Sequence, residues 1–177
     1  METARLLLRR WRPHDRAPFA ALNADPRVTE FLGGPMTREA SDAMAERVDR
    51  EFDRLGFGLY VAEHKTTGET IGYIGLSVPT FEAHFTPCVE IGWRLAADYW
   101  GQGLATEGAR AVLEHGFSAC GLEEIVSFTV PANVRSRRVM EKLGLTHNPA
   151  DDFDHPRIPE GHPLRRHVLY RISRPKP

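Results

Sequence analysis

The stretch that decides the fold is residues 90–106, EIGWRLAADYWGQGLAT. It begins as a strand that alternates between two faces, and from Leu104 onward the spacing of apolar residues is helical. Between strand and helix stand Gly101, Gln102 and Gly103. The first amides of a helix lack partners and carry partial positive charge, and glycines let a ligand approach the backbone closely. The stretch therefore predicts a phosphate-binding turn.

Neither of the two standard phosphate-binding motifs fits this turn. A P-loop needs a lysine and then Ser or Thr after its last glycine, whereas Leu104 and Ala105 follow Gly103 here. A dinucleotide-binding GxGxxG motif lacks its third glycine, because Thr106 occupies that position. On spacing alone, a tight turn that binds nothing remains an open alternative.

The rest of the chain predicts a mixed α/β sheet. The turn KTTGE at residues 65–69 joins two strands as a hairpin, so the sheet is partly antiparallel rather than wholly parallel. We expect strands at residues 5–11, 57–64, 70–78, 88–95, 124–130 and 165–172. We expect helices at residues 16–23, 39–55 (capped by Thr37 and Gly56), 104–119, and from Asn133 to Gly144.

Composition narrows the class of protein. The 177 residues are 41% hydrophobic and 27% charged, which predicts one domain with a real core and a frayed tail at residues 173–177. A net charge of -1 disfavours a dedicated nucleic-acid binder. The sequence lacks an apolar run of membrane-spanning length and a signal peptide at its start, and Cys88 and Cys120 show no CxxC spacing. These features predict a cytoplasmic protein that binds no membrane.

Three motifs resemble those of the GNAT acetyltransferase superfamily. Residues 100–105, WGQGLA, match its acyl-CoA loop, [R/Q]-x-x-G-x-[G/A], at Gly103 and Ala105, with Trp100 where Arg or Gln is usual. That departure is typical of the RimJ/RimL-like branch, the ribosomal-protein N-terminal acetyltransferases. Residues 133–145, NVRSRRVMEKLGL, resemble that branch's N-x-x-S-x-x-V-x-E-K-x-G-[FL], and residues 3–10, TARLLLRR, resemble its T-x-R-L-x-L-R.

The resemblance implies a single GNAT domain over residues 1–177, with a twisted sheet of six to seven strands, helices on both faces and splayed central parallel strands. It implies direct acetyl transfer from acetyl-CoA to a primary amine, on a protein N-terminus or a small molecule, with no metal. A non-catalytic acyl-CoA sensor or scaffold with the same fold is the alternative. A homodimer is expected by analogy alone.

The resemblance also assigns cofactor-binding residues. The turn amides would hold the pyrophosphate, the strand backbone would pair with pantetheine, and Asn133, which is also a favoured helix cap, would hold the pantetheine arm. Arg138 shares a helix face with Arg135 and Lys142, which predicts either contact with the CoA 3′-phosphate or a solvated face. The predicted cofactor-binding residues are Trp93, Arg94, Leu95, Gln102, Gly103, Leu104, Ala105, Thr106, Asn133 and Arg138.

Glu90 and Ser136 are the predicted catalytic residues. An amine must lose a proton before it attacks a thioester, and relatives often have a Glu at this strand position linked to that role. The alternative is an ion pair between Glu90 and Arg94 on the same strand face. Ser136 would protonate the leaving thiolate. Its spacing to Met140 also fits a core serine bonded to its own helix.

The acceptor is expected to meet Phe31, Leu32 and Gly33, which lie where relatives line the acceptor pocket, with the helix at residues 39–55 as a wall. The His and Asp residues between positions 147 and 162 have no metal-ligand spacing. They predict a flexible acidic loop rather than a metal site.

Overall fold

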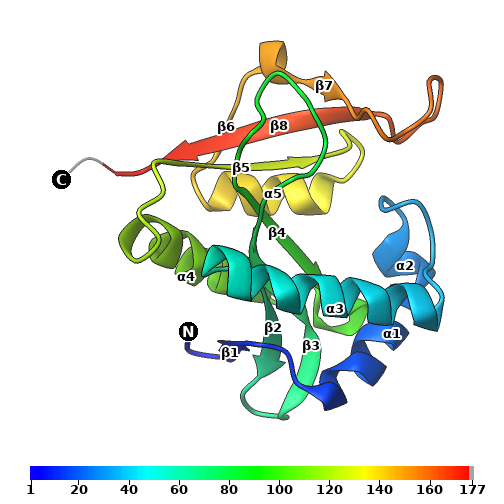
Figure 1. The fold of residues 1–177 in the computed structure, drawn as a ribbon, viewed down its shortest axis with the longest axis vertical. Coiled ribbons are helices and arrows are strands. Elements are labelled where there is room, and N and C mark those ends of the chain that lie inside the picture. Colours follow the sequence, from blue (N-terminus) through cyan, green and yellow to red (C-terminus); the bar gives the residue numbers. More distant parts are fainter. Residues whose placement is uncertain (176–177) are drawn as a thin grey trace.

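The computed structural model describes residues 1–175, which form an open mixed sheet with helices on both faces (Figure 1). The strand order is β1-β2-β3-β4-β5-β8-β6, and β7 pairs with β8. The strands are β1 (Leu6–Arg9), β2 (Leu59–His64), β3 (Glu69–Ser77), β4 (Glu90–Leu95), β5 (Glu124–Thr129), β6 (Thr146–His147), β7 (Phe153–Asp154) and β8 (Arg166–Ser173). The helices are α1 (Arg16–Ala24), α2 (Pro26–Thr29), α3 (Arg38–Leu55), α4 (Leu104–Ser118) and α5 (Val134–Lys142).

The predicted GNAT fold class is confirmed, and the strand count is larger than expected. The sheet has eight strands rather than six or seven, because β6 and β7 form within the segment predicted as a loop. Each of these two strands is two residues long, too short to leave a periodic pattern in the sequence.

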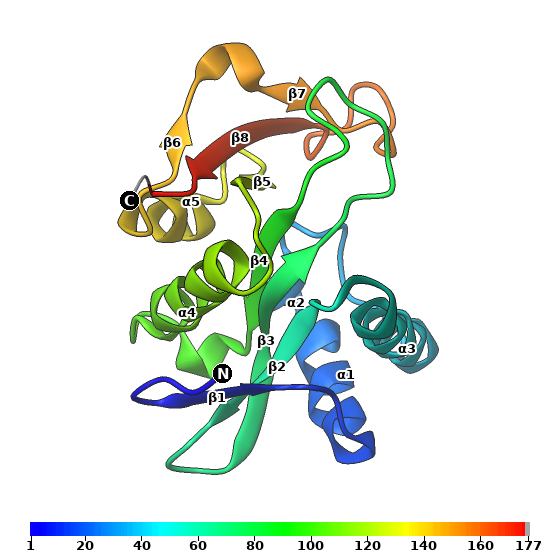
Figure 2. The same ribbon diagram turned by 60° about the vertical axis from the view of Figure 1, so that its left-hand side comes forward.

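The helices divide between the two faces of the sheet. Figure 2 shows α4 and α5 on one side of β4 and α1 to α3 on the other. On the α4 side, Ile91 and Leu95 of β4 are buried against Leu104 and other apolar residues of α4. The predicted alternation of β4 is therefore confirmed. Its other face, which carries Glu90, Gly92 and Arg94, is turned toward the side of α1 to α3.

The central parallel strands part immediately after they meet. In their register β4 and β5 share one residue pair, Glu90 with Val126, and the Val126 amide donates to the Val89 carbonyl at 2.9 Å. One residue further on, the Ser127 hydroxyl donates to the Ile91 carbonyl at 2.9 Å. The remainder of β4 is paired with β3 alone. This is the splay that the family resemblance implies.

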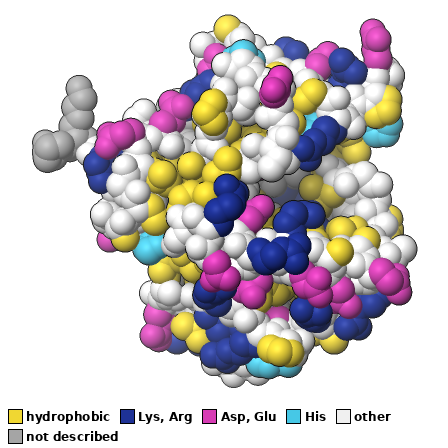
Figure 3. Space-filling model, viewed as in Figure 1, with side chains coloured by type: hydrophobic (Ala, Val, Ile, Leu, Met, Phe, Trp, Pro, Cys, Tyr) yellow, Lys and Arg dark blue, Asp and Glu magenta, His cyan; other side chains and the backbone are white. Residues whose placement is uncertain are grey.

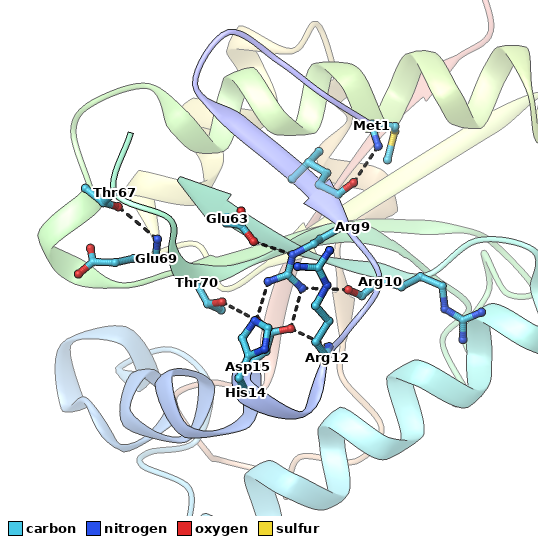
Figure 4. Close-up of polar contacts among 11 residues, drawn as sticks. Met1, Arg9, Arg10, Arg12, His14, Asp15, Glu63, Thr67, Glu69 and Thr70 are labelled. Carbon is cyan, nitrogen blue, oxygen red and sulfur yellow. Dashed lines mark hydrogen bonds and ion pairs between the residues drawn. The ribbon is translucent and has the colours of Figure 1, made fainter. Parts of the chain in front are cut away.

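A buried ionic network ties the first strand to the rest of the sheet (Figure 4). Asp15, in the 3-10 turn η1 (Pro13–Asp15), is fully buried and accepts two hydrogen bonds from Arg9 at 2.7 and 2.8 Å. Thr70 donates to the same carboxylate, and Arg9 also contacts Glu63 at 2.7 Å. Strands β1, β2 and β3 and the turn η1 are thus held together at one point.

The end of the chain is ordered further than the sequence predicts. Ser173 closes β8, and the Arg174 amide donates to the Glu123 carbonyl at 2.8 Å, so these two residues do not fray. Residues 176 and 177 of the expected tail lie outside the described residues. Within residues 1–175, no helix combines the length and apolarity that crossing a membrane requires.

Candidate active site

A cleft of about 440 Å³ opens where β4 and β5 part. It is lined from the segment around α2, from β3 and β4, from the turn before α4, from β5 and from α5. In the space-filling view, Lys and Arg side chains border a hollow near the middle of the face (Figure 3). Of the predicted site residues, the following line the cleft: Phe31, Leu32, Glu90, Trp93, Arg94, Leu95, Gly103, Leu104, Ala105, Thr106, Asn133, Ser136 and Arg138.

The turn before α4 has the geometry of an anion site. Gly101 and Gly103 take positive φ angles of 74° and 80°, which side-chain-bearing residues rarely adopt. The first backbone bond of α4 runs from Glu107 to the Gly103 carbonyl, and no side chain caps the helix. The amides of Leu104, Ala105 and Thr106 therefore lack intrahelical partners at the cleft, where the helix dipole favours negative charge.

Gln102 lies behind the turn and does not line the cleft. Its side chain donates to the Asp98 carbonyl at 3.2 Å, and its own carbonyl accepts from Arg5 at 2.9 Å. Arg5 is in turn bound to Glu107 at 2.7 Å. These contacts fix the back of the turn, so Gln102 shapes the site through its backbone.

The backbone of Trp93 faces the gap between the splayed strands. The carbonyls of Val89 and Ile91 point toward β5, and backbone groups alternate in direction along a strand. The N–H and C=O of Trp93 therefore point the same way, beyond the last β4–β5 pair. An extended amide chain lying in the gap would find a donor and an acceptor there.

Trp100, which departs from the usual loop pattern, closes the turn. Its indole N–H donates to the Leu95 carbonyl at 2.8 Å. The Arg135 guanidinium lies over its ring at 4.4 Å and forms an ion pair with Glu30 at 3.0 Å. Arg135 thus connects α5 to both the turn and the segment after α2.

The start of α5 places two predicted residues together. The Asn133 carbonyl oxygen of the side chain caps the Ser136 amide at 3.2 Å, and its Nδ2 donates to the hydroxyls of Thr129 and Ser136. Asn133 is therefore the helix cap, as predicted, and it also lines the cleft. Because the Ser136 oxygen accepts this bond, its own hydroxyl hydrogen is free to turn toward the cleft.

Glu90 lies at the point of the splay. It is partly buried, and the one hydrogen bond that its carboxylate accepts from residues 1–175 comes from Ser77 at a long 3.5 Å. Burial raises the pKa of Glu90 to about 8, opposed only by that weak bond. Among the described residues Glu90 makes no ion pair with Arg94, so that alternative is wrong. Residues four apart on a strand stand roughly 13 Å apart at their Cα atoms.

The side of the cleft that was expected to meet an acceptor is built differently from the prediction. Phe31 and Leu32 line it, but Gly33 does not, and neither does any residue of α3. The segment around α2 forms the wall instead, while α3 stands behind it and contributes the buried Ser41. Helix α2 is four residues long and has no periodic pattern that sequence reasoning could have detected.

Several residues of the cleft were missed from the sequence. Gly92 lies between Glu90 and Arg94 on the same strand face, so the alternation of β4 was a usable signal. A Cβ at Gly92 would meet nothing within 4 Å, which leaves open space beside Glu90. Tyr73 and Ser127 come from separate strands, and only the tertiary fold brings them to the cleft.

The segment between residues 147 and 162, predicted as a flexible acidic loop, forms ion pairs through its charged residues. His147 contacts Asp152 at 2.7 Å, and Asp151 pairs with Arg171 at 2.9 Å. Within residues 1–175 no group of three or more His, Cys, Asp or Glu side chains is arranged to hold a metal. The segment reaches the cleft indirectly, because Phe153 packs on Phe128 with ring centres 5.5 Å apart.

Known proteins resemble this chain in sequence and in fold. The family model of the acetyltransferase (GNAT) domain matches residues 5–146. The FsC-acetyl coenzyme A-N(2)-transacetylase of Aspergillus fumigatus is 35% identical over 142 residues, which are 76% of this chain and 60% of that protein. The chain thus spans less than two thirds of that relative's length.

Two solved structures show the same architecture. The acetyltransferase from Agrobacterium tumefaciens superposes with a TM-score of 0.78 at 28% identity, covering 98% of this chain and 93% of that one. Mycobacterium smegmatis RimJ in complex with CoA-disulfide has a TM-score of 0.73 at 21% identity, covering 97% and 86%. With the family model spanning most of its length, the chain belongs to the GNAT family of acetyltransferases.

Proposed function

We propose that this protein transfers the acetyl group of acetyl-CoA to a primary amine by direct attack in a ternary complex. The observation that carries the proposal is that one cleft holds both an anion-binding helix start and a carboxylate without a strong partner, Glu90. The family membership and the CoA-bound RimJ structure of the same fold support acetyl-CoA as the donor.

The chain's own groups suit the CoA skeleton. The amides of Leu104, Ala105 and Thr106 would receive the pyrophosphate, and the Trp93 backbone would pair with pantetheine, whose arm Asn133 would hold. Across the turn, Arg138 and Lys142 of α5 also line the cleft. Their positive charges are suited to the 3′-phosphate.

Bound acetyl-CoA supplies a thioester carbon that an amine can attack. Glu90 takes the proton that the attacking nitrogen must lose, directly or through a water molecule, as the C–N bond forms. We assign the Trp93 carbonyl to pantetheine and the Trp93 amide, which also faces the gap, to the oxyanion. When the C–S bond breaks, the Ser136 hydroxyl donates a proton to the departing thiolate and takes one back from solvent.

The acceptor class remains part of the proposal. The Aspergillus relative is named for acetyl transfer to an N(2) nitrogen, and the motifs of this chain resemble those of ribosomal-protein N-terminal acetyltransferases, so we keep a small-molecule amine and a protein N-terminus as the two acceptor classes. Both cysteines are free, which suits a reducing cytoplasm, and we place the reaction there. A homodimer stays a prediction by analogy.

Calorimetric titration with acetyl-CoA, with ATP and NAD as controls, tests the donor. Free-thiol release with a library of amines tests the transfer. We expect micromolar binding of acetyl-CoA alone and thiol release that depends on an added amine. Tight binding with no thiol release from any amine would instead support the acyl-CoA sensor or scaffold. If acetyl-CoA does not bind, even with amines present, the proposal is wrong.

A further inference from the structure

Arg94 is a cation held on the acceptor side of the cleft without a carboxylate. It lies on the same face of β4 as Glu90 and lines the cleft. Its Nη1 donates to the Asn23 side-chain oxygen of α1 at 2.5 Å, and its guanidinium lies 5.5 Å from the centre of the Tyr73 ring. Within residues 1–175 no Asp or Glu lies within ion-pair distance of it.

The support around Arg94 is itself buried and polar. Asn23 and Ser41 are both fully buried, and the Asn23 Nδ2 donates to the Ser41 hydroxyl at 2.9 Å. This bond fixes the amide so that its oxygen points at Arg94. A buried polar pair of this kind orients the guanidinium, because an unmade hydrogen bond there would cost free energy.

Only one edge of the guanidinium is used by the protein. The printed bonds of Arg94 all start at Nη1, toward Asn23 and the Met36 sulfur. Nε is buried with no partner in the described chain, and Nη2 makes no bond there either. With Nη1 already bonded, the Nε–Nη2 edge still presents two parallel N–H groups that match the two oxygens of a carboxylate.

The described charged residues that line the cleft include no acidic partner for Arg94. Glu90 is the one acidic residue among the described residues that line it. Arg27 pairs with Asp25 at 2.7 Å and Arg135 with Glu30. The two other lining cations, Arg138 and Lys142, come from α5 on the opposite side of the sheet, where CoA phosphates are proposed to bind.

We propose that Arg94 binds a carboxylate of the acceptor, so that the enzyme acetylates amines that carry a carboxylate group. This inference rests on the proposed function and narrows it. The amine would lie toward Glu90 and the carboxylate toward Arg94, along one face of β4. The same arrangement disfavours polycationic acceptors, because their additional charges would meet Arg94 in place of an anion.

Matched acceptors separate charge recognition from general reactivity. We would measure kcat and KM by thiol release for glycine, 4-aminobutyrate and 6-aminohexanoate, each against its own primary amide. The three lengths sample the separation between amine and carboxylate. The acid-to-amide ratio of kcat/KM is compared between variants, so that differences in the basicity of the amines cancel.

Two variants and one control isolate Arg94. R94Q removes the cation. N23D keeps Arg94 and its contact with α1 but supplies an internal carboxylate that competes with the acceptor's. R47Q removes an exposed arginine of α3 that does not line the cleft, and it controls for net charge. Circular dichroism melts confirm that each variant is folded.

We expect the acid-to-amide ratio to fall at least about tenfold in R94Q and in N23D, mainly through KM, and to stay at the wild-type value in R47Q. A ratio that R94Q and N23D leave unchanged would overturn the proposal. Equal kcat/KM values of wild type and R94Q for every acid in the panel would also overturn it.

A second readout does not need turnover. The melting temperature of CoA-saturated protein is measured with each acid and each amide. Stabilisation by acids over amides that is lost in R94Q supports the carboxylate site, and equal shifts in wild type and R94Q contradict it. Acid-specific stabilisation without thiol release from any amine would refute the proposed transfer while leaving this site in place.

Discussion

Asp15, in the turn η1 beside the sheet, and Glu90, on strand β4, are both carboxylates shielded from solvent, and they differ in their hydrogen-bond partners. Asp15 is fully buried and receives hydrogen bonds from Arg9, Thr70 and the Arg12 amide. Burial alone would raise its pKa, but these bonds outweigh burial and hold the pKa below its usual range. Glu90 has one long bond from Ser77, and burial raises its pKa to about 8.

The difference in hydrogen bonding distinguishes a carboxylate with a structural role from one that can transfer protons. A carboxylate that is saturated with donors stays ionised and holds elements together, as Asp15 holds β1 to β3. A carboxylate that is desolvated with one weak donor can exchange a proton near neutral pH, which is what a general base requires. Perturbed acids in a cleft are therefore candidates for function, whereas satisfied ones are not.

The largest expected effect is on turnover. Glu90→Gln removes the base while keeping the size of the side chain, and kcat should fall by roughly 10²–10⁴-fold. Acetyl-CoA affinity, measured by calorimetry, should be unchanged because Glu90 does not contact the turn before α4. Glu114→Gln, on an exposed position of α4, is the matched control. Wild-type turnover in E90Q would remove Glu90 from the mechanism.

Next in size is the loss of stability when Asp15 is replaced. Asp15→Asn removes the carboxylate that neutralises the buried guanidinium of Arg9. We expect a loss of about 3 kcal/mol in the free energy of unfolding. This value is at the low end of the destabilisation expected for a broken buried ion pair, because Arg9 keeps its ion pair with Glu63 at 2.7 Å. Urea denaturation checks this. Asp53→Asn, which breaks an exposed pair with Arg10, should change little, and an equal loss in both would contradict the account.

The pH dependence of stability should have opposite signs at the two sites. Glu90 binds its proton more tightly in the folded state, so its contribution to stability declines as pH rises from about 4.5 to about 8. The free energy of unfolding of E90Q should therefore rise relative to that of wild type through that interval, by up to about 1.4 kcal/mol per pH unit. Asp15 stabilises above pH 3.8, and that stability is lost as pH falls through its lowered pKa.

Denaturation of wild type, E90Q and D15N at a series of pH values measures both signs. The E90Q-minus-wild-type difference should rise with pH up to about 8. The wild-type-minus-D15N difference should shrink only in acid. A flat E90Q difference would mean that Glu90 is ordinarily solvated.

The smallest expected effect concerns the space beside Glu90. Gly92→Ala places a methyl group where nothing lies within 4 Å, so the fold should tolerate it while the acceptor KM rises a few-fold. Gly75→Ala is the contrasting variant, because its Cβ would lie 2.2 Å from the Gly58 carbonyl oxygen and the sheet would have to open. Thermal melts and acceptor kinetics on both variants check the contrast. An unchanged KM in G92A would place the acceptor elsewhere.

Local patterns predicted the regular elements well. Thr37 and Gly56 bound α3 as expected, the first accepting from the Ala40 amide and the second in the left-handed conformation. The turn before α4 also formed as its glycines required. These features depend on residues within a few positions of one another, so sequence spacing is sufficient to find them.

Contacts between side chains far apart in the chain could not be predicted from the sequence. Asp15 and Thr70 are 55 positions apart, and Arg94 and Asn23 are 71 apart. No periodicity links such residues, and only the packing of the sheet brings them together. The site was therefore predictable where it follows one strand, one turn and one helix start. It was not predictable on the side expected to meet the acceptor, where residues from the α2 segment and from separate strands come together.

The most direct test of the central claim is the pH profile of kcat/KM for acetyl transfer, in wild type and in E90Q, with one amine acceptor. If the desolvated Glu90 is the base, wild-type kcat/KM shows a rise with an apparent pKa near 8 in addition to the titration of the amine, because only the ionised carboxylate accepts a proton. E90Q should lack that rise and keep only the titration of the amine itself. Superimposable profiles would contradict the account.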